Sequence, residues 1–309
     1  MTTVTEVRLD GWHLKRALEG AKLYIEQHID EVNSLNVFPV PDGDTGINMF
    51  LTIKSATEAT RRASSSAGIV AAAAAKGALV GARGSSGVIL SQILKGMAKG
   101  LEGRETFSFA DLAHALHIGS EQAYNVMEKP IEGTILTVIK AASEEALRVA
   151  QKRISFARAV STVLVRARET VRETKEMLPV LKEAGVVDAG AKGLYYFFEG
   201  LVSAICRKPT RTLFSKNPSG NNGPPVRKEE RVYGFDVQFL LKGKALPVDE
   251  IKNKVLASGE CPLVVGDEKL LKVHVHTMNP EEILNYAHSK GIVKDIIVED
   301  MDSQVRKKQ

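Results

Sequence analysis

Two aspartates separated by a single glycine stand out within the segment from Asn36 to Asn48. The segment reads Asn-Val-Phe-Pro-Val-Pro-Asp-Gly-Asp-Thr-Gly-Ile-Asn. Its prolines and glycines are incompatible with a regular helix, so they predict a rigid turn that carries Asp42 and Asp44. Carboxylates this close repel each other unless a cation lies beside them, and oxygen ligands on a constrained loop suit Mg²⁺. The segment is therefore a candidate magnesium site.

An Asp-Gly-Asp sequence is also an ordinary solvated turn, because Asp and Gly are common turn residues. Here the apolar residues 37–40 precede the two aspartates, which indicates that the loop is partly buried. Unpaired charge is costly in such a place. The sequence therefore favours the metal site, and the simple turn stays open as the alternative.

A second loop, Gly81-Ala-Arg-Gly-Ser-Ser-Gly87, precedes a segment with helical periodicity at residues 88–97. Its glycines allow the backbone to approach a ligand, and Ser85 or Ser86 is expected to cap the helix, whose amides would then face an anion. Such a loop is more often only a helix cap. Together with the aspartate loop it becomes a candidate phosphate site, although it lacks the Gly-x-x-x-x-Gly-Lys-Ser/Thr pattern of P-loop proteins.

Helices are expected to position these loops in a domain that spans residues 1–206. Apolar residues recur at three- and four-residue steps and predict helices over 14–32, 48–62, 69–79, 88–97, 109–127, 134–152 and 156–177, with a last one ending near residue 205. Asp188 lies in a glycine-punctuated turn before the last helix, where it is most simply a helix cap. The sequence thus predicts an all-helical first domain.

Residues 207–231 are rich in Lys, Arg and Pro and lack periodicity, which predicts a basic linker. The period then changes to two, which predicts a second domain over 232–309: strand 232–241, helix 247–257, strands 262–266 and 270–277, helix 280–288 and strand 293–299. Asn279 and Glu282 are expected to form a capping box at the second of these helices. This β-α-β-β-α-β order is that of a ferredoxin-like domain.

Two histidines occur two residues apart in the predicted strand 270–277. Both imidazoles of His274 and His276 should therefore lie on one face of the strand, opposite Val273 and Val275. Two histidines can contribute to a Zn²⁺ site but do not complete one. The sequence pattern alone favours a surface or packing role over a metal site.

The composition is that of an ordinary globular protein: 309 residues, 44% hydrophobic and 26% charged. The longest apolar run, residues 68–75, is too short to span a membrane, and the N-terminus has no signal-peptide pattern, so we expect a cytoplasmic protein. Cys206 and Cys261 do not make a disulfide framework. A net charge of +5 without a basic motif interleaved with aromatics does not favour nucleic-acid binding.

Four blocks of sequence, in order, resemble the nucleotide-binding domain shared by the L subunit of dihydroxyacetone kinase and the bacterial protein fatty acid kinase A. They are NVFPVPDGDTGINM, GARGSSGVILSQIL, KPIEGTILTV and GVVDAGAKGL, and the later KVHVHT resembles the middle domain of fatty acid kinase A. Asn36 and the Pro-Val-Pro insertion are closer to the fatty acid kinase branch. The resemblance implies a helical barrel, similar to the dihydroxyacetone kinase L subunit, whose loops hold ATP and two Mg²⁺ ions.

The resemblance also implies roles for individual residues. Asp42 and Asp44 would be catalytic magnesium ligands, and Asn36 would be a third magnesium ligand, at the place where the dihydroxyacetone kinase branch carries another Asp. The phosphates would be surrounded by Thr45, Asn48, Gly84, Ser85 and Ser86, and the nucleotide pocket would be closed by Asp188 and Gly190. In the family's middle domain the histidine pair joins a Cys in a zinc site. This chain has Asp236 in the matching block, so Asp236 or Cys261 would replace that Cys, or the metal is absent.

The implied activity is the ATP-dependent phosphorylation of a fatty acid to an acyl phosphate, with the fatty acid presented by a separate DegV-type carrier protein. A fatty carboxylate is already ionised at neutral pH, so the reaction needs charge neutralisation and positioning more than a general base. No segment suggests an apolar tunnel, which is consistent with a carrier. Two alternatives stay open: a dihydroxyacetone kinase-type phosphotransferase, and a regulatory or scaffold protein that binds nucleotide without turnover and forms a homodimer through its second domain.

Overall fold

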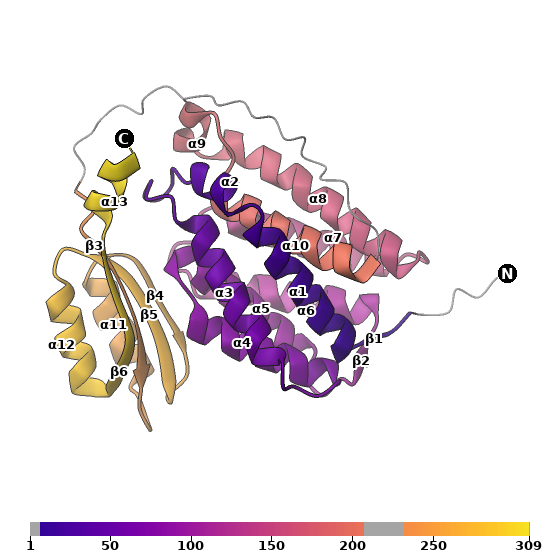
Figure 1. Ribbon diagram of the computed structural model, residues 1–309, viewed down its shortest axis with the longest axis horizontal. Helices are drawn as coiled ribbons and strands as arrows, with labels where there is room; N and C mark the ends of the chain where they lie inside the picture. Colours follow the sequence, from indigo (N-terminus) through magenta and orange to yellow (C-terminus); the bar gives the residue numbers. More distant parts are fainter. Residues whose placement is uncertain (1–6, 207–231, 309) are drawn as a thin grey trace.

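The computed structural model describes residues 7–206 and 232–308 (Figure 1). Up to residue 206 the described chain is almost entirely helical, with α1 (Gly11–Glu26), α2 (Ile29–Ser34), α3 (Thr45–Thr60), α4 (Ala67–Gly81), α5 (Gly84–Gly100), α6 (Phe109–Asn125), α7 (Ile135–Ala150), α8 (Phe156–Met177), α9 (Pro179–Ala184) and α10 (Ala189–Cys206). A helical first domain is therefore confirmed. The predicted linker, residues 207–231, lies outside the described residues.

Three details of the helical domain differ from the prediction. Two short strands, β1 (Leu9–Asp10) and β2 (Thr106–Phe107), pair antiparallel, and two residues are too few to show a period in the sequence. The helix expected over 14–32 is divided into α1 and α2 between residues 26 and 29. Helix α5 begins at Gly84 instead of residue 88, because its first turn consists of glycine and serine and carries no apolar side chain that would mark the helical period.

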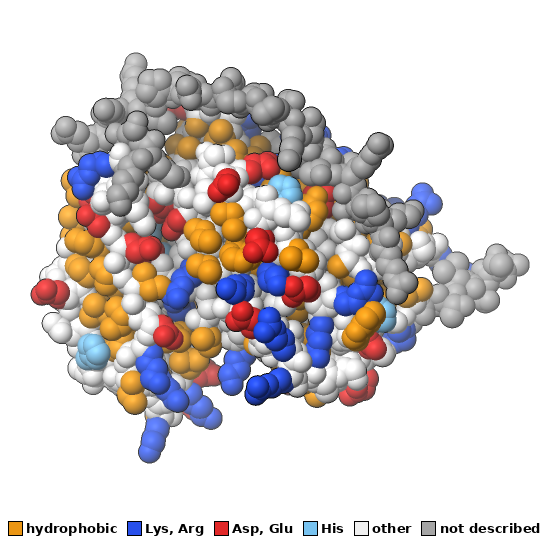
Figure 2. Space-filling model, in the orientation of Figure 1, with side chains coloured by type: hydrophobic (Ala, Val, Ile, Leu, Met, Phe, Trp, Pro, Cys, Tyr) orange, Lys and Arg blue, Asp and Glu red, His pale blue; other side chains and the backbone are white. Residues whose placement is uncertain are grey.

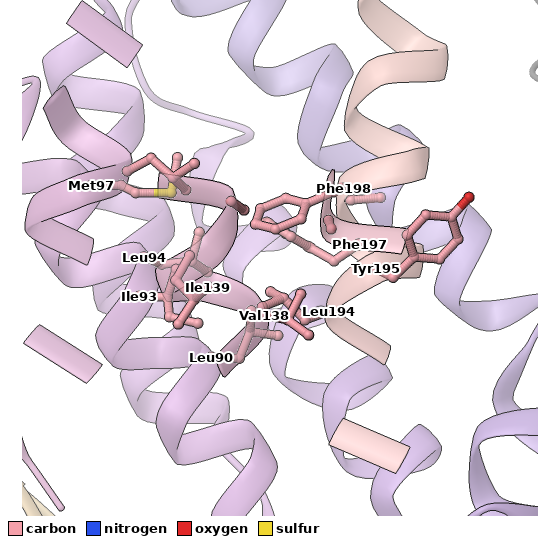
Figure 3. Packing of buried hydrophobic residues seen from close by; sticks show 14 of the residues in the cluster. Leu90, Ile93, Leu94, Met97, Val138, Ile139, Leu194, Tyr195, Phe197 and Phe198 are labelled. Carbon is pink, nitrogen blue, oxygen red and sulfur yellow. The ribbon is translucent and has the colours of Figure 1, made fainter. Parts of the chain in front are cut away.

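The core of the helical domain is built from the apolar faces of its long helices, α5, α7 and α10 among them. Figure 3 shows Leu90, Ile93 and Leu94 of α5 facing Val138 and Ile139 of α7, with Leu194 and Phe197 of α10 beside them. These side chains are buried, as expected for apolar stripes at helical spacing. Helix α10 therefore holds the turn at its N-terminus in a fixed position relative to α5.

The second domain contains β3 (Phe235–Lys242), α11 (Val248–Ala257), β4 (Glu260–Gly266), β5 (Leu270–Thr277), α12 (Pro280–Lys290), β6 (Ile292–Asp300) and α13 (Met301–Lys308). The predicted β-α-β-β-α-β order is confirmed, and α13 follows it without having been predicted. The strands form one antiparallel sheet in the order β4-β5-β3-β6. The predicted capping box is wrong: Asn279 makes no side-chain cap, and Glu282 instead accepts a 2.6 Å hydrogen bond from Lys254 Nζ.

The sheet has two different faces. One face carries Val237, Phe239, Val273 and Val275 into a core with α11 and α12, and Figure 1 shows these helices on the side away from the helical domain. The other face lies against the helical domain, where Leu263 and Val265 of β4 pack with Ala82 and Val88 in a small buried cluster. The second domain therefore touches the helical domain beside the N-terminus of α5.

Inside the helical domain is an apolar cavity of about 90 Å³, which the sequence did not indicate. It is lined by hydrophobic side chains that include Leu94, Leu116, Leu164 and Phe197. An apolar cavity of roughly 150 Å³ binds a single benzene molecule, so this smaller one does not accommodate a long acyl chain in the present conformation.

Basic, acidic and apolar side chains are interspersed on the face of the molecule in Figure 2, as on an ordinary solvated surface. Across the two described ranges, no helix has both the length and the apolar character needed to cross a bilayer.

Candidate functional site

The loop of residues 36–44, which we call the aspartate loop, is held by hydrogen bonds of its own side chains. The buried Asn36 amide donates to Val40 O at 2.6 Å and to Asp42 Oδ1 at 2.9 Å, and its oxygen accepts from the Thr45 hydroxyl. The Phe38–Pro39 peptide bond within the loop is cis. The Asn36 amide thus joins the aspartate loop to the first residue of α3 and positions Asp42.

Asp44 ends the aspartate loop immediately before α3. Its side chain makes no cap for that helix, which is capped instead by Asn33 Oδ1 accepting from Gly46 N at 2.7 Å. Burial raises the pKa of Asp44, and the charge of Asp236 in β3 raises it further, against a lowering hydrogen bond from Asn48. A buried carboxylate beside other carboxylates is a donor set that fits a hard cation.

Ser85 and Ser86 lie in the first turn of α5, so neither is the cap that the sequence predicted; the N-cap is Arg83. Gly84 has a φ of 55°, and a Cβ on it would lie 2.4 Å from Asn48 Nδ2, so only glycine allows α5 to start this close to α3. The Gly84 amide donates to Gln238 Oε1 at 3.0 Å, and Ser85 Oγ lies 3.2 Å from His274 Nε2. The start of α5 therefore contacts the sheet of the second domain.

The sheet residues at this contact include Asp236, His274 and His276, whose nearest ligand atoms all lie within 4.8 Å of one another. Both histidines are buried on one face, as the spacing predicted, and Asp236 is directly opposite His276 on β3. Asp236 Oδ1 and His274 Nδ1 are 3.0 Å apart but make no hydrogen bond. We call these three residues the Asp-His cluster, and its donors fit Zn²⁺. Cys261 is not part of it.

Burial affects which side chains of the Asp-His cluster carry a charge. Burial, then the charge of His274, lowers the pKa of His276 to about 4, which keeps this imidazole neutral as a metal ligand requires. Burial raises the pKa of Asp236, but the two histidines outweigh it and hold that pKa below its ordinary value. Asp236 also accepts a 2.6 Å hydrogen bond from Gln238. The cluster is thus an ionised carboxylate beside a neutral imidazole.

One cavity of about 160 Å³ brings the predicted site residues together. Its lining includes every residue assigned above to metal or nucleotide: Asn36, Asp42, Asp44, Thr45, Asn48, Gly84, Ser85, Ser86, Asp188, Gly190, Asp236, His274 and His276. The aspartate loop and the Asp-His cluster, predicted as separate sites in separate domains, therefore face the same space.

Several residues around this cavity were missed. Phe38, Ile89, Met127, Ile131 and Leu263 form an apolar wall whose members look like ordinary core residues in the sequence. Burial, then the charges of Asp236 and Asp44, raises the pKa of Glu299 in β6. None of these residues carries a sequence motif.

Asp188, in the lining of the cavity, and Lys272, two residues before His274, are buried ionisable side chains. Asp188 caps α10 by accepting from Ala191 N at 2.7 Å, as predicted, and burial raises its pKa to about 7. Burial, then the charge of Arg83, lowers the pKa of Lys272 to about 8. Lys272 shares the strand alternation of His274 and His276, and that pattern could have identified it.

Comparison with known proteins identifies two families along the chain. The DAK2 domain matches residues 39–203, and the middle domain of fatty acid kinase A-like proteins matches residues 232–308. A dihydroxyacetone kinase from C. freundii, solved in complex with AMP-PNP and Mg²⁺, is similar with a TM-score of 0.48 and 18% identity, covering 66% of this chain and 36% of that chain.

Curated relatives include uncharacterized proteins of Staphylococcus saprophyticus, Staphylococcus epidermidis and Staphylococcus aureus, each 36% identical to this chain. The matches cover 94% of this chain and 54% to 55% of each relative. The chain thus spans about half the length of the curated relatives it matches. With a DAK2 domain followed by the matching middle domain, the chain belongs to the family of fatty acid kinase A-like proteins.

Proposed function

We propose that this chain supplies the ATP-binding and middle domains of a phosphotransferase that phosphorylates a fatty acid on a DegV-type carrier protein to give an acyl phosphate. The observation that carries the proposal is the single cavity in which the aspartate loop, the start of α5 and the Asp-His cluster meet. The domain limits in this proposal are residues 1–206 and 232–309, joined by 207–231. The sheet order of the second domain supports a ferredoxin-like assignment, and a helical barrel is the proposed class of the first.

In this proposal, Asp42 and Asp44 hold Mg²⁺, and Asn36 positions Asp42 for that role. Magnesium, when bound, neutralises phosphate charge in phosphoryl transfer. The raised pKa of the buried Asp44 supports the assignment, because a positive charge at this place would relieve the crowding of carboxylates. The count of two ions stays a proposal taken from the family.

The start of α5 is the proposed phosphate site. Ser85 and Ser86 lie in its first turn and line the cavity, and the positive end of a helix dipole favours an anion there. Thr45 and Asn48 line the same space from α3. The apolar wall formed by Phe38, Ile89, Met127, Ile131 and Leu263 offers a surface for the base of the nucleotide, next to Asp188 and Gly190.

The acceptor is proposed to be a carboxylate that arrives already ionised, so no residue is required to remove a proton from it. The small apolar cavity of the helical domain does not hold a long acyl chain, which supports delivery by a carrier. Cytoplasmic location and a homodimer through the second domain belong to the same proposal.

Calorimetry of the whole chain with ATP in the presence and absence of Mg²⁺ tests the nucleotide site. We expect binding that requires Mg²⁺, followed by acyl phosphate formation when a lipid-loaded DegV-type carrier is added. Turnover only with dihydroxyacetone bound to a partner would favour the dihydroxyacetone kinase alternative. Nucleotide binding without turnover alongside every carrier would favour the regulatory or scaffold alternative. No binding of nucleotide would refute all three.

The Asp-His cluster leads to a prediction about metal content. We expect the purified protein to contain less than one Zn²⁺ per chain, since a carboxylate replaces the softer thiolate that zinc prefers. Asp236→Ala should lower the content further, whereas Asp249→Ala, which removes an exposed carboxylate on α11, should not. Metal analysis by mass spectrometry checks both variants. One tightly held zinc per chain, unchanged in Asp236→Ala, would contradict the assignment.

A further inference from the structure

Two buried cationic atoms at the interface of the domains have no hydrogen-bond partner among the described residues. One is Nζ of Lys272 in β5, whose side chain is fully buried. The other is the Nη1 atom of Arg83, at the N-cap of α5. The Arg83 side chain as a whole is half-buried, whereas Lys272 is a fully buried cation without a partner, which is strongly unfavourable, so this arrangement is incomplete as it stands.

The register of the sheet places these two side chains at the same contact. Gln238 and His274 are paired across β3 and β5, and they meet Gly84 and Ser85 directly. The next row on this face of the sheet contains Lys272, with Leu240 on one side and Val265 on the other.

Val265 packs with Ala82, the residue before Arg83. Residues 82–85 therefore run along the row of Gln238 and His274 and the row of Lys272. Arg83 lies in the part of this segment that is next to Lys272. The two positive charges are close enough to interact.

The nearby carboxylates do not complete the arrangement: Glu299 in β6 interacts with Arg83 through its charge, but it accepts no hydrogen bond from Arg83 Nη1. The charge of Asp236 acts on Lys272. However, Asp236 accepts a 2.6 Å hydrogen bond from Gln238, and its Oδ1 lies 3.0 Å from His274 Nδ1. Asp295 also acts on Lys272 through its charge, yet it lies exposed on the edge strand β6. Neither carboxylate accepts a hydrogen bond from Lys272 Nζ.

We propose that Arg83 and Lys272 together bind one phosphate group at the interface of the two domains. Arg offers a planar fork and Lys a point charge, a combination suited to a tetrahedral oxyanion. Arg83 and Lys272 are not themselves in the lining of the shared cavity, but each adjoins it: Arg83 directly precedes Gly84 and Ser85, and Lys272 is two residues before His274, so we assign the phosphate to the nucleotide. That assignment rests on the proposed function, whereas the binding of a phosphate oxyanion does not. Lys272 then makes nucleotide affinity depend on the second domain.

Lys272→Met tests the proposal, because methionine has a similar volume and no charge. Without ligand, we expect its melting temperature to equal or exceed that of the wild type, since an unpaired buried charge has been removed. Its affinity for the bound phosphate ligand should fall about tenfold or more, as expected when a charged hydrogen bond is lost. Lys294→Met is the matched control, because Lys294 lies in the same row of the sheet, opposite Leu240, but is exposed.

Calorimetry with Mg·ATP, Mg·ADP and inorganic phosphate identifies the source of the phosphate. Weaker binding of ATP alone assigns the terminal phosphate, and equal weakening of ATP and ADP assigns an inner one. If the wild type binds no nucleotide but is stabilised by inorganic phosphate through Lys272, the proposed function fails and the anion site stands. Arg83→Gln provides a second variant should Lys272→Met not fold. Unchanged affinities for all three ligands in the folded variants would overturn the proposal.

Discussion

Replacing Asp44 by Asn is expected to lower the proposed ATP-dependent phosphoryl transfer by about a thousandfold or more, because loss of the proposed metal ligand at such a site costs several kcal/mol in the transition state. The loop itself should survive, since Asn tolerates the same backbone conformations as Asp. Burial and Asp236 raise the pKa of Asp44, so its charge is unfavourable when no cation is present. The stability of the variant without Mg²⁺ should therefore equal or exceed that of the wild type. Asp42→Asn should show the same loss of activity.

Two measurements separate the metal site from a simple turn. One is the rate of acyl phosphate formation with a lipid-loaded carrier, and the other is the change in melting temperature on adding Mg²⁺ with ATP. Both should be lost in Asp44→Asn and retained in Asp30→Asn, which removes an exposed carboxylate from α2. Near-normal activity in Asp42→Asn and Asp44→Asn would mean that the aspartate loop is only a turn.

Asp188→Asn is expected to change the pH dependence of folding. The pKa of Asp188 is about 7 in the folded chain, against an ordinary value of 3.8. As pH rises from about 4 to 7, the unfolded chain loses this proton while the folded chain keeps it, so the wild type loses stability over this window. The loss is complete above pH 7 and amounts to about 4 kcal/mol. Asn has no proton to lose and can still accept from Ala191 N, so the variant should gain that much relative to the wild type.

Urea unfolding of both proteins at pH 4.5 and pH 8 tests this expectation. The unfolding free energy of Asp188→Asn, relative to that of the wild type, should be larger at pH 8 than at pH 4.5. Asp249→Asn, which alters an exposed carboxylate of α11, should show a constant difference from the wild type. A pH-independent difference for Asp188→Asn would show that the folded chain holds this carboxylate ionised.

The sequence predicted the elements of the fold best where one strong period runs through a whole segment. Helix α8 and strand β5 have the predicted bounds, because their apolar residues repeat without interruption. The pair β1 and β2 was missed because it depends on a contact between distant segments. The predicted cap at Asn279 was wrong, since the competing contact of Glu282 with Lys254 comes from a neighbouring helix.

For the candidate site, each loop was recognisable in the sequence, but the relation between the loops was not. The alternation of β5 predicts that His274 and His276 share a face, and nothing in it says that this face meets α5. Gln238 and Lys272 look like solvent-facing strand residues until the other domain covers them. Burial of charge at an interface depends on how two domains dock, which a periodic pattern does not encode.

The hydrogen bond from the Gly84 amide to Gln238 links two equilibria of the molecule. A ligand that requires this amide must displace Gln238, whereas a ligand that bridges the two domains must hold them together. In either case, association of the domains and occupancy of the cavity share one coupling free energy, and thermodynamic reciprocity fixes its value in both directions. If docking of the second domain changes the ligand affinity by some factor, then binding of the ligand changes the equilibrium constant for docking by the same factor. Occupancy of the cavity can therefore be followed from the distance between the domains.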